Sequence, residues 1–188
     1  MAGYITINIS SPNTQGLRNF HNQEQLKKLL TGLNKIIKEK KIDRPIAIKI
    51  SPDIKDNEIS KIVELVSSHN IKGIIVSNTT DGNRDDLLDI KKNEIGGLSG
   101  QPLKDISTKL IKNFYKETKG KIKIIGVGGV DSGQSAYEKI TAGADVIQLY
   151  TGMVYKGPGI VKEIKKDLIS ILKKENLKNI SEAVGINA

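Results

Sequence analysis

Three polar side chains follow the first apolar run of the sequence, where they could take part in acid–base or binding chemistry. Residues 4–9 are rich in β-branched side chains, which favours a strand, and Pro12 fixes the turn that follows. Asn8, Ser11 and Asn13 therefore fall at or just beyond the C-terminal end of a strand, where α/β barrels carry their catalytic groups. The alternative is a turn that is rich in serine and asparagine for structural reasons alone.

A lysine stands inside a second apolar run. The neighbours of Lys49 in residues 46–50 indicate burial, and a buried ammonium needs a partner or its charged form is disfavoured. A fixed anion or a ligand carbonyl at the C-terminal edge of the sheet would supply that partner. The alternative is an edge-strand lysine whose ammonium reaches solvent.

Later runs end in further hydrogen-bonding groups. Residues 77–80 (Ser-Asn-Thr-Thr) close a third apolar run, and capping of the next turn accounts for only one or two of these side chains. Glycine-rich residues 126–130 follow a fourth run, and residues 150–152 (Tyr-Thr-Gly) follow a fifth. Glycine-rich turns present backbone N–H groups to phosphate, and barrels bind phosphate with the loops after their last two strands. The sequence therefore predicts an anion site here.

Alternating strands and helices would position these residues. We expect strands at residues 5–9, 46–50, 73–77, 122–127 and 145–150. We expect helices at about 24–40, across 59–66, from 105 to about 120, from 132 to 143 and from 160 to 174. The connection of residues 78–103 is long enough to be a lid or binding loop.

This pattern is typical of an α/β protein whose parallel sheet is buried on both sides. Two architectures fit it: a five-stranded doubly wound sheet, or five strands of an eight-stranded barrel. Periodicity does not choose between them. The length of 188 residues is enough for one domain with a real core.

Composition excludes several classes of protein. There is no cysteine, hence no disulfide and no thiolate metal site. The two histidines, His21 and His69, are far apart, so we interpret both as ordinary surface or loop residues and expect no metal site. No apolar run has transmembrane length, and no signal peptide is expected at the start.

The formal net charge is +9, from 30 Lys and Arg against 21 Asp and Glu. The lysines are spread over the polar faces of several predicted helices, and aromatic residues make up only 4% of the chain. Solvated helix faces explain this charge better than a nucleic-acid surface, which would need a basic stripe or a stacking platform. We expect no nucleic-acid partner, and the charge is compatible with an anionic ligand.

Six segments occur in a fixed order: residues 8–14, Lys49, residues 77–80, residues 96–103, residues 125–130 and residues 148–151. Together they closely resemble class 2 dihydroorotate dehydrogenases, the quinone-linked flavoenzymes of pyrimidine synthesis. The resemblance covers essentially the whole chain. Ser11 stands where class 2 enzymes have their catalytic serine, whereas class 1 relatives use cysteine there. The family often has threonine at the position of Ser77.

The resemblance implies a role for each of these residues. Ser11 would be the catalytic base. Dihydroorotate or orotate would be held by Asn8, Asn13, Asn78 and Thr79. The cofactor, flavin mononucleotide (FMN), would be held by Asn8, Lys49, Ser77, Gly100, Gly129, Tyr150 and Thr151.

The five expected strands resemble the fourth to the eighth of the family's eight-stranded barrel. We therefore expect residues 1–188 to form a single, incomplete (β/α) barrel domain that lacks the N-terminal strands and the membrane-associated helices that admit quinone. The complete enzyme would associate with the bacterial inner membrane on its cytoplasmic side, or with the mitochondrial inner membrane. This chain has no expected membrane segment of its own.

Two hypotheses follow for the chain itself. In the first, it belongs to a flavin oxidoreductase and works only with the missing N-terminal part of the barrel. In the second, it is a non-catalytic half-barrel that binds FMN or phosphate weakly. In either case the strands that begin near Ile5 and Asp145 would be free edges, which predicts self-association.

Overall fold

The computed structural model describes residues 2–82 and 84–188, and shows one sheet of five short parallel strands. Residue 83, inside the predicted long connection, and residue 1 lie outside the described part. The strands are β1 (Ile5–Asn8), β2 (Ile46–Lys49), β3 (Gly73–Val76), β4 (Lys123–Gly126) and β5 (Val146–Ile147). They lie side by side in chain order. This order excludes a doubly wound sheet, in which strand order reverses at a switch point, and agrees with a segment of a barrel.

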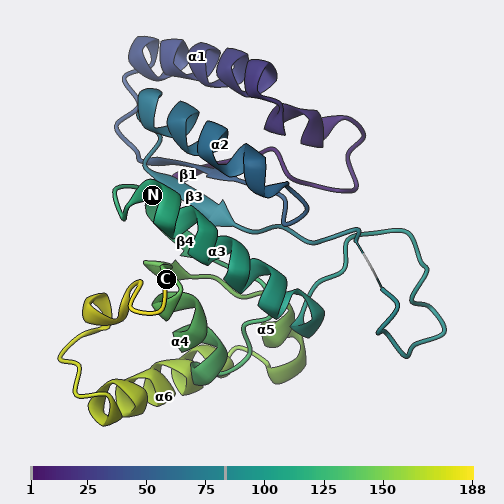
Figure 1. Cartoon of the computed structure of the whole chain (residues 1–188), viewed down its shortest axis with the longest axis vertical. Coiled ribbons are helices and arrows are strands. Elements are labelled where there is room, and N and C mark those ends of the chain that lie inside the picture. Colours follow the sequence, from purple (N-terminus) through teal and green to yellow (C-terminus); the bar gives the residue numbers. More distant parts are fainter. Residues whose placement is uncertain (1, 83) are drawn as a thin grey trace.

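The helices follow one another along the sheet in the same order (Figure 1). The α-helices are α1 (Gln23–Glu39), α2 (Asp56–Ser68), α3 (Lys104–Thr118), α4 (Gly133–Thr141), α5 (Thr151–Lys156) and α6 (Ile160–Lys174). Three 3-10 helices are η1 (Leu17–His21), η2 (Gln101–Leu103) and η3 (Ile180–Ala183). The sequence did not predict α5, because a helix of six residues that exposes most of its side chains shows no apolar periodicity.

Hydrophobic side chains between the helices and the outer face of the sheet form the main core. Ile48, Ile74 and Ile124 point into it from three adjacent strands, and Leu30 of α1 and Phe114 of α3 cover them. The other face of each strand carries the alternate residues, because side chains of a strand alternate between its two faces. Ala47, Ile75 and Ile125 form a separate small cluster there.

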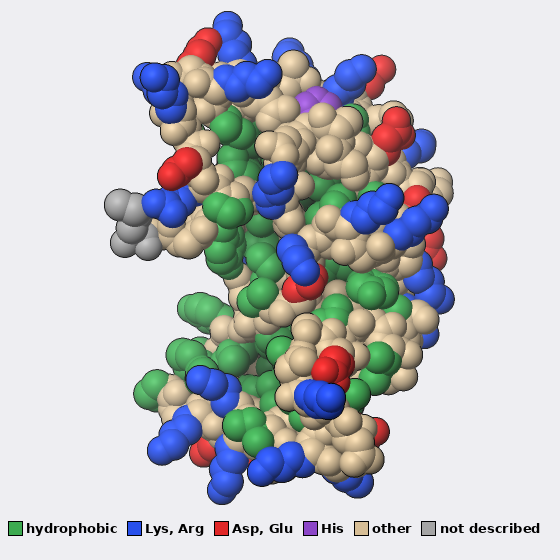
Figure 2. All heavy atoms as spheres, turned by 90° about the vertical axis from the view of Figure 1, so that its left-hand side faces the viewer, with side chains coloured by type: hydrophobic (Ala, Val, Ile, Leu, Met, Phe, Trp, Pro, Cys, Tyr) green, Lys and Arg blue, Asp and Glu red, His purple; other side chains and the backbone are tan. Residues whose placement is uncertain are grey.

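The sheet is strongly curved around this inner face. Nε2 of Gln148, just after β5, donates a hydrogen bond of 2.6 Å to the hydroxyl of Tyr4, just before β1. In a flat sheet the two edge strands would lie roughly 19 Å apart, four spacings of about 4.8 Å, beyond the reach of these side chains. Figure 2 shows a hollow on one side of the molecule with hydrophobic side chains gathered along it. The inner face is thus the concave face of a rolled sheet.

The predicted boundaries are close to those observed. Each strand ends before its predicted last residue. The pairing nevertheless continues for one residue after β1, β2 and β3, because the backbone N–H groups of Ile9, Ile50 and Ser77 donate to carbonyl oxygens of Lys49, Ile75 and Val127, respectively. Ser132 caps α4 as predicted, since its side chain accepts a hydrogen bond from the N–H of Ser135. Among the described helices, none is both long enough and apolar enough to cross a membrane.

Candidate functional site

A cleft of about 970 Å³ opens at the C-terminal ends of the strands, between the loops after β3, β4 and β5 and residues 95–103. This volume lies at the upper end of the range for small-molecule and cofactor sites, roughly 300–1,000 Å³. The cleft brings together most of the residues singled out in the sequence. Those that line it are Lys49, Ser77, Asn78, Thr79, Gly100, Gly129, Tyr150 and Thr151.

Asn8 does not line the cleft, but hydrogen bonds connect it to a residue that does. Nδ2 of Asn78 donates to Oγ of Ser10 at 3.0 Å and to Oδ1 of Asn8 at 3.5 Å. Ser10 donates its hydroxyl to the same Oδ1 at 2.7 Å. The Asn78 Oδ1 in turn accepts the backbone N–H of Thr79 at 2.8 Å. The polar residues after β1 and β3 therefore form one network.

Ser11 and Asn13 lie on the loop after β1, outside the residues that line the cleft. The half-buried Ser11 accepts a hydrogen bond at its Oγ from the backbone N–H of Asn13, at 3.3 Å. No described side chain accepts the Ser11 proton. The loop is held against the cleft wall, because a Cβ at Gly97 would lie 2.9 Å from Cγ of Pro12 and would overlap Thr79.

Lys49 ends β2, which lies between β1 and β3, so the edge-strand interpretation is wrong. Its side chain is half-buried and lines the cleft. Among residues 2–82 and 84–188, nothing forms a hydrogen bond or an ion pair with its ammonium group. Burial lowers the pKa of Lys49 below its ordinary value of 10.5. An anion, or a group that becomes negative, would be stabilised beside this ammonium.

The glycine turn after β4 forms another wall of the cleft. Gly128 and Gly129 adopt φ of 118° and 69°, and a Cβ at Gly129 would lie 2.7 Å from Cα of Lys104. Only glycine fits so close to α3 with this backbone conformation. In the described chain, the backbone N–H groups of Gly128 and Gly129 have no acceptor.

The loop after β5 packs directly beside this turn, since a Cβ at Gly152 would lie 2.5 Å from the carbonyl oxygen of Val130. Thr151 donates its hydroxyl to Oγ of Ser99 at 2.9 Å, and Gly100 packs against its methyl group. Tyr150 and Thr151, like the two glycines, have backbone N–H groups without an acceptor in the described residues. Donors from two loops therefore border the same cavity.

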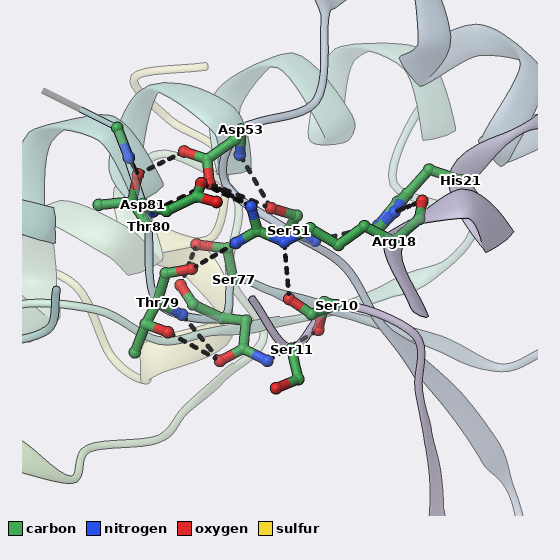
Figure 3. A network of polar contacts seen from close by, with 12 residues as sticks. Ser10, Ser11, Arg18, His21, Ser51, Asp53, Ser77, Thr79, Thr80 and Asp81 are labelled. Carbon is green, nitrogen blue, oxygen red and sulfur yellow. Dashed lines mark hydrogen bonds and ion pairs between the residues drawn. The ribbon is translucent and has the colours of Figure 1, made fainter. Parts of the chain in front are cut away.

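A network that sequence reasoning missed ties three loops together (Figure 3). Nη1 of Arg18 lies 2.6 Å from Oδ1 of Asp81 and 3.1 Å from Oδ2 of Asp53. The same guanidinium donates to the carbonyl oxygens of Ser10 and Thr79, at 3.3 and 3.2 Å. Hydrogen bonding to Arg18 holds the pKa of Asp81 below its ordinary value of 3.8. Because these residues follow β1, β2 and β3, Arg18 fixes the relative positions of the loops after three strands.

His21 belongs to this network, and its interpretation as an ordinary surface or loop residue is wrong. It is buried, its Nδ1 lies 2.8 Å from the carbonyl oxygen of Arg18, and its Nε2 accepts the N–H of Ser51 at 3.1 Å. These two contacts require a neutral ring that carries its proton on Nδ1. Desolvation by burial lowers the pKa of His21 below 6.5, which favours the same neutral form. In the sequence, the only indication of this role is that His21 lies in the segment after the first predicted strand.

The long connection between β3 and α3 folds back on the cleft. Thr80 and Leu98 form an antiparallel bridge, with N···O distances of 3.2 and 2.7 Å. Arg84 donates to the carbonyl oxygens of Lys92 at 3.1 Å and of Glu94 at 2.6 Å, and also to that of Gly96. Several of its residues line the cleft, as expected for a binding loop.

These features suit a ligand that carries a phosphate group. The glycine turn is a cradle that a Cβ would fill, its backbone donors have no acceptors among the described residues, and the unpaired Lys49 lines the same cleft. The four residues that the resemblance assigns to the phosphate end of the cofactor, Gly100, Gly129, Tyr150 and Thr151, all line this cleft. The described residues contain no cluster of three or more side chains suited to a metal ion.

Comparison with known proteins agrees with this description. Residues 1–172 match the family described as dihydroorotate dehydrogenase. A protein of Trichodesmium erythraeum named dihydroorotate dehydrogenase (quinone) is 45% identical over 97% of this chain, and the match covers 50% of that protein. The Mus musculus protein named dihydroorotate dehydrogenase (quinone), mitochondrial, is 39% identical over 100% of this chain and 48% of its own length.

Solved structures give the same result. DHODH from Eimeria tenella in complex with ferulenol superposes with a TM-score of 0.94 at 34% identity, over 99% of this chain and 54% of that one. The ligand-free type gives a TM-score of 0.93. The five strands are therefore part of a (β/α) barrel. The chain belongs to the dihydroorotate dehydrogenase family, and it spans about half the length of the curated relatives that it matches.

Proposed function

We propose that this chain forms part of an FMN-dependent, quinone-linked dihydroorotate dehydrogenase, which oxidises dihydroorotate to orotate in pyrimidine biosynthesis. The observation that carries the proposal is the single cleft into which the structure gathers Lys49, Asn78, Thr79, Gly129 and Thr151. These residues come from the ends of four different strands or the loops that follow them. A site assembled in this way from several strand ends is typical of a barrel active site.

In this proposal Ser11 takes the proton that dihydroorotate loses. A free hydroxyl is a poor base near neutral pH, and no described side chain activates Ser11 in the structure. Ser11 therefore needs a relay through bound water or substrate, and a substrate held in reactive geometry. A bound flavin would supply the redox chemistry, as acceptor of the hydride from the neighbouring carbon and donor of electrons to quinone.

Amide and hydroxyl side chains would hold the substrate ring. Asn8, Asn78 and Thr79 already share hydrogen bonds, so their positions are fixed before a ligand arrives. Asn13 would complete the set from the exposed loop after β1. Asn and Thr side chains offer both donors and acceptors, which suits the alternating N–H and C=O groups of dihydroorotate and orotate.

The remaining residues would hold FMN. The half-buried ammonium of Lys49 would stabilise negative charge that develops on the ring during reduction, because no carboxylate among the described residues neutralises it. Ser77 would contact the ring from the end of β3, and Asn8 would lie between flavin and substrate. Gly100, Gly129, Tyr150 and Thr151 would bind the ribityl phosphate end.

The relatives are about twice as long as this chain, so the activity would belong to the complete barrel. In this proposal an N-terminal part of the barrel would cover the inner face and complete the flavin site, and membrane-associated helices would admit quinone. The complete enzyme would then sit at a bacterial or mitochondrial inner membrane. The open inner face favours a second candidate for the chain alone, a half-barrel without turnover that binds FMN or phosphate weakly.

The test is an anaerobic titration of the purified protein that contains this chain. We expect it to retain FMN, and we expect dihydroorotate to bleach the visible flavin absorbance, with quinone restoring it. Bound FMN that dihydroorotate does not bleach would contradict the proposal.

A further inference from the structure

One lysine of α4 is fully buried, unlike the solvated lysines that the composition predicts. The side chain of Lys139 is 0% exposed. Its Nζ donates to Oγ of Ser107 at 2.6 Å, to Oγ1 of Thr108 at 2.9 Å and to the carbonyl oxygen of Lys104 at 3.2 Å. All three acceptors belong to the start of α3 and all are uncharged. Lys139 does not line the cleft, so it has no direct part in binding a ligand there.

Ser107 connects this ammonium to the glycine turn. An ammonium only donates hydrogen bonds, so Ser107 must offer Lys139 a lone pair and direct its own proton elsewhere. That proton is shared between the carbonyl oxygens of Lys104 at 3.1 Å and Gly128 at 3.3 Å. The charge of Lys139 thus fixes the direction in which Ser107 donates.

The turn packs directly on Ser107. A Cβ at Gly128 would lie 2.8 Å from Oγ of Ser107, so no side chain separates the two. The carbonyl of Gly128 is drawn toward α3 by this hydroxyl. Gly128 and Gly129 line the cleft, and in the described residues their N–H groups donate to no protein acceptor.

We propose that Lys139 is a positioning residue of the phosphate site: through Ser107 it holds Gly128 and Gly129 in the conformation that leaves their N–H groups available to a phosphate ester. This inference rests on the proposed function, because it specifies how one end of the flavin site is built. Lys139 acts on the ligand only through Ser107 and the turn.

The charge state of Lys139 supports this role. Burial lowers its pKa to about 8, so the ammonium form still predominates at neutral pH. The charges of Glu138 on α4 and Asp105 on α3 favour the ammonium form, and that of Lys104 on α3 opposes it. A buried charge without a hydrogen-bonded carboxylate is costly compared with a hydrophobic side chain of the same length. If the side chain at position 139 only filled space, methionine would therefore be more stable there than lysine.

Two variants and a matched control test the inference in the protein that contains this chain. Lys139→Met removes the ammonium, and Ser107→Ala removes the hydroxyl that reaches Gly128. Thr108→Val is the control, because Thr108 also binds Lys139 but does not contact the turn. The probes are FMN and riboflavin, which differ only in the phosphate, titrated by flavin fluorescence.

We expect Lys139→Met and Ser107→Ala to weaken FMN binding about tenfold, the effect of one charge-assisted hydrogen bond. Riboflavin affinity should stay constant in both, and Thr108→Val should change neither. A purely structural role would weaken FMN and riboflavin binding equally, and that result would overturn the inference. Unchanged FMN affinity in both variants would overturn it as well.

A second measurement does not depend on flavin. The backbone order parameters of Gly128 and Gly129, from NMR relaxation, should fall in Ser107→Ala and remain unchanged in Thr108→Val. If the wild type bound neither flavin, the proposed function would fail, and this measurement alone would decide the inference. Unchanged order parameters of Gly128 and Gly129 in Ser107→Ala would then overturn it. If Lys139→Met does not fold, the flavin titration and the measurement on Gly128 and Gly129 are both made on Ser107→Ala.

Discussion

Asn8 and Lys49 are paired residues of two adjacent parallel strands. Side chains of paired residues leave the sheet on the same face, so the amide and the ammonium stand next to each other on the inner face, at the C-terminal ends of β1 and β2. Asn8 belongs to the hydrogen-bonded network with Ser10 and Asn78, whereas Lys49 forms no hydrogen bond or ion pair with any of the described residues. One face of the sheet thus offers a fixed amide beside an unpaired cation.

Replacing Lys49 tests the role of that cation. We expect Lys49→Met to leave the thermal stability of the flavin-free protein unchanged or slightly raised, because it removes a half-buried charge that has no acidic partner. We expect the midpoint potential of bound FMN to fall. A lost interaction of about 1.4 kcal/mol with the reduced form corresponds to roughly 30 mV for a two-electron couple. Lys72→Met, at an exposed position just before β3 and outside the cleft, is the control. An unchanged potential in Lys49→Met would refute the role.

His21 should make folding stability depend on pH. Burial lowers its pKa in the folded state below 6.5, the value expected for the unfolded chain. Between these two pKa values the unfolded state binds more protons, so stability is complete above about pH 6.5 and falls as the pH decreases. We expect urea unfolding to show that the free energy of unfolding falls less between pH 7.5 and pH 5.5 in His21→Gln than in wild type.

The matched control for that experiment is His69→Gln, which removes the other histidine and keeps the contacts of His21 with Arg18 and Ser51. It should retain the pH dependence of the wild type. Equal pH dependence in wild type and His21→Gln would exclude His21 as its source.

Arg18 should contribute more to stability than either of its acidic partners. Its side chain is 23% exposed, and it contacts groups after three different strands. We expect Arg18→Met to lower the free energy of unfolding by about 2 kcal/mol, because it leaves half-buried acceptors unpaired. Asp81→Asn should cost under about 1 kcal/mol, since the Asp81 side chain is 57% exposed. Chemical denaturation compares the two, and equal losses would argue against a central role of Arg18.

A protein made of these residues alone should self-associate and should not turn over dihydroorotate with quinone. β1 and β5 are the two edges of the sheet and carry unpaired backbone groups. Val146 of β5 is 50% exposed, so Val146→Lys should reduce association by placing a charge on that edge. Light scattering over a range of concentrations measures this. A stable monomer would show that other segments protect the edges, and turnover near that of a complete relative would contradict the second expectation.

Local sequence predicted the sheet and the polar strand ends, because β-branched runs and the residues that follow them are contiguous in the chain. It could not predict that β2 is central, which depends on pairing between strands and decides how Lys49 is placed. The partners of Arg18, His21 and Lys139 are also distant in sequence, for example Asp81 for Arg18 and Ser107 for Lys139. Periodicity describes one element at a time and carries no signal for such contacts.

The reduction of bound FMN by dihydroorotate tests the central claim most directly. In the protein that contains this chain, stopped-flow absorbance should show rapid reduction in wild type and in Thr14→Ala, an exposed control on the same loop. Ser11→Ala should retain FMN, but dihydroorotate should reduce this FMN at least about 100-fold more slowly, because a general base usually contributes a factor of this size. An unchanged reduction rate in Ser11→Ala would exclude Ser11 as the base, and FMN that dihydroorotate never reduces would contradict the account as a whole.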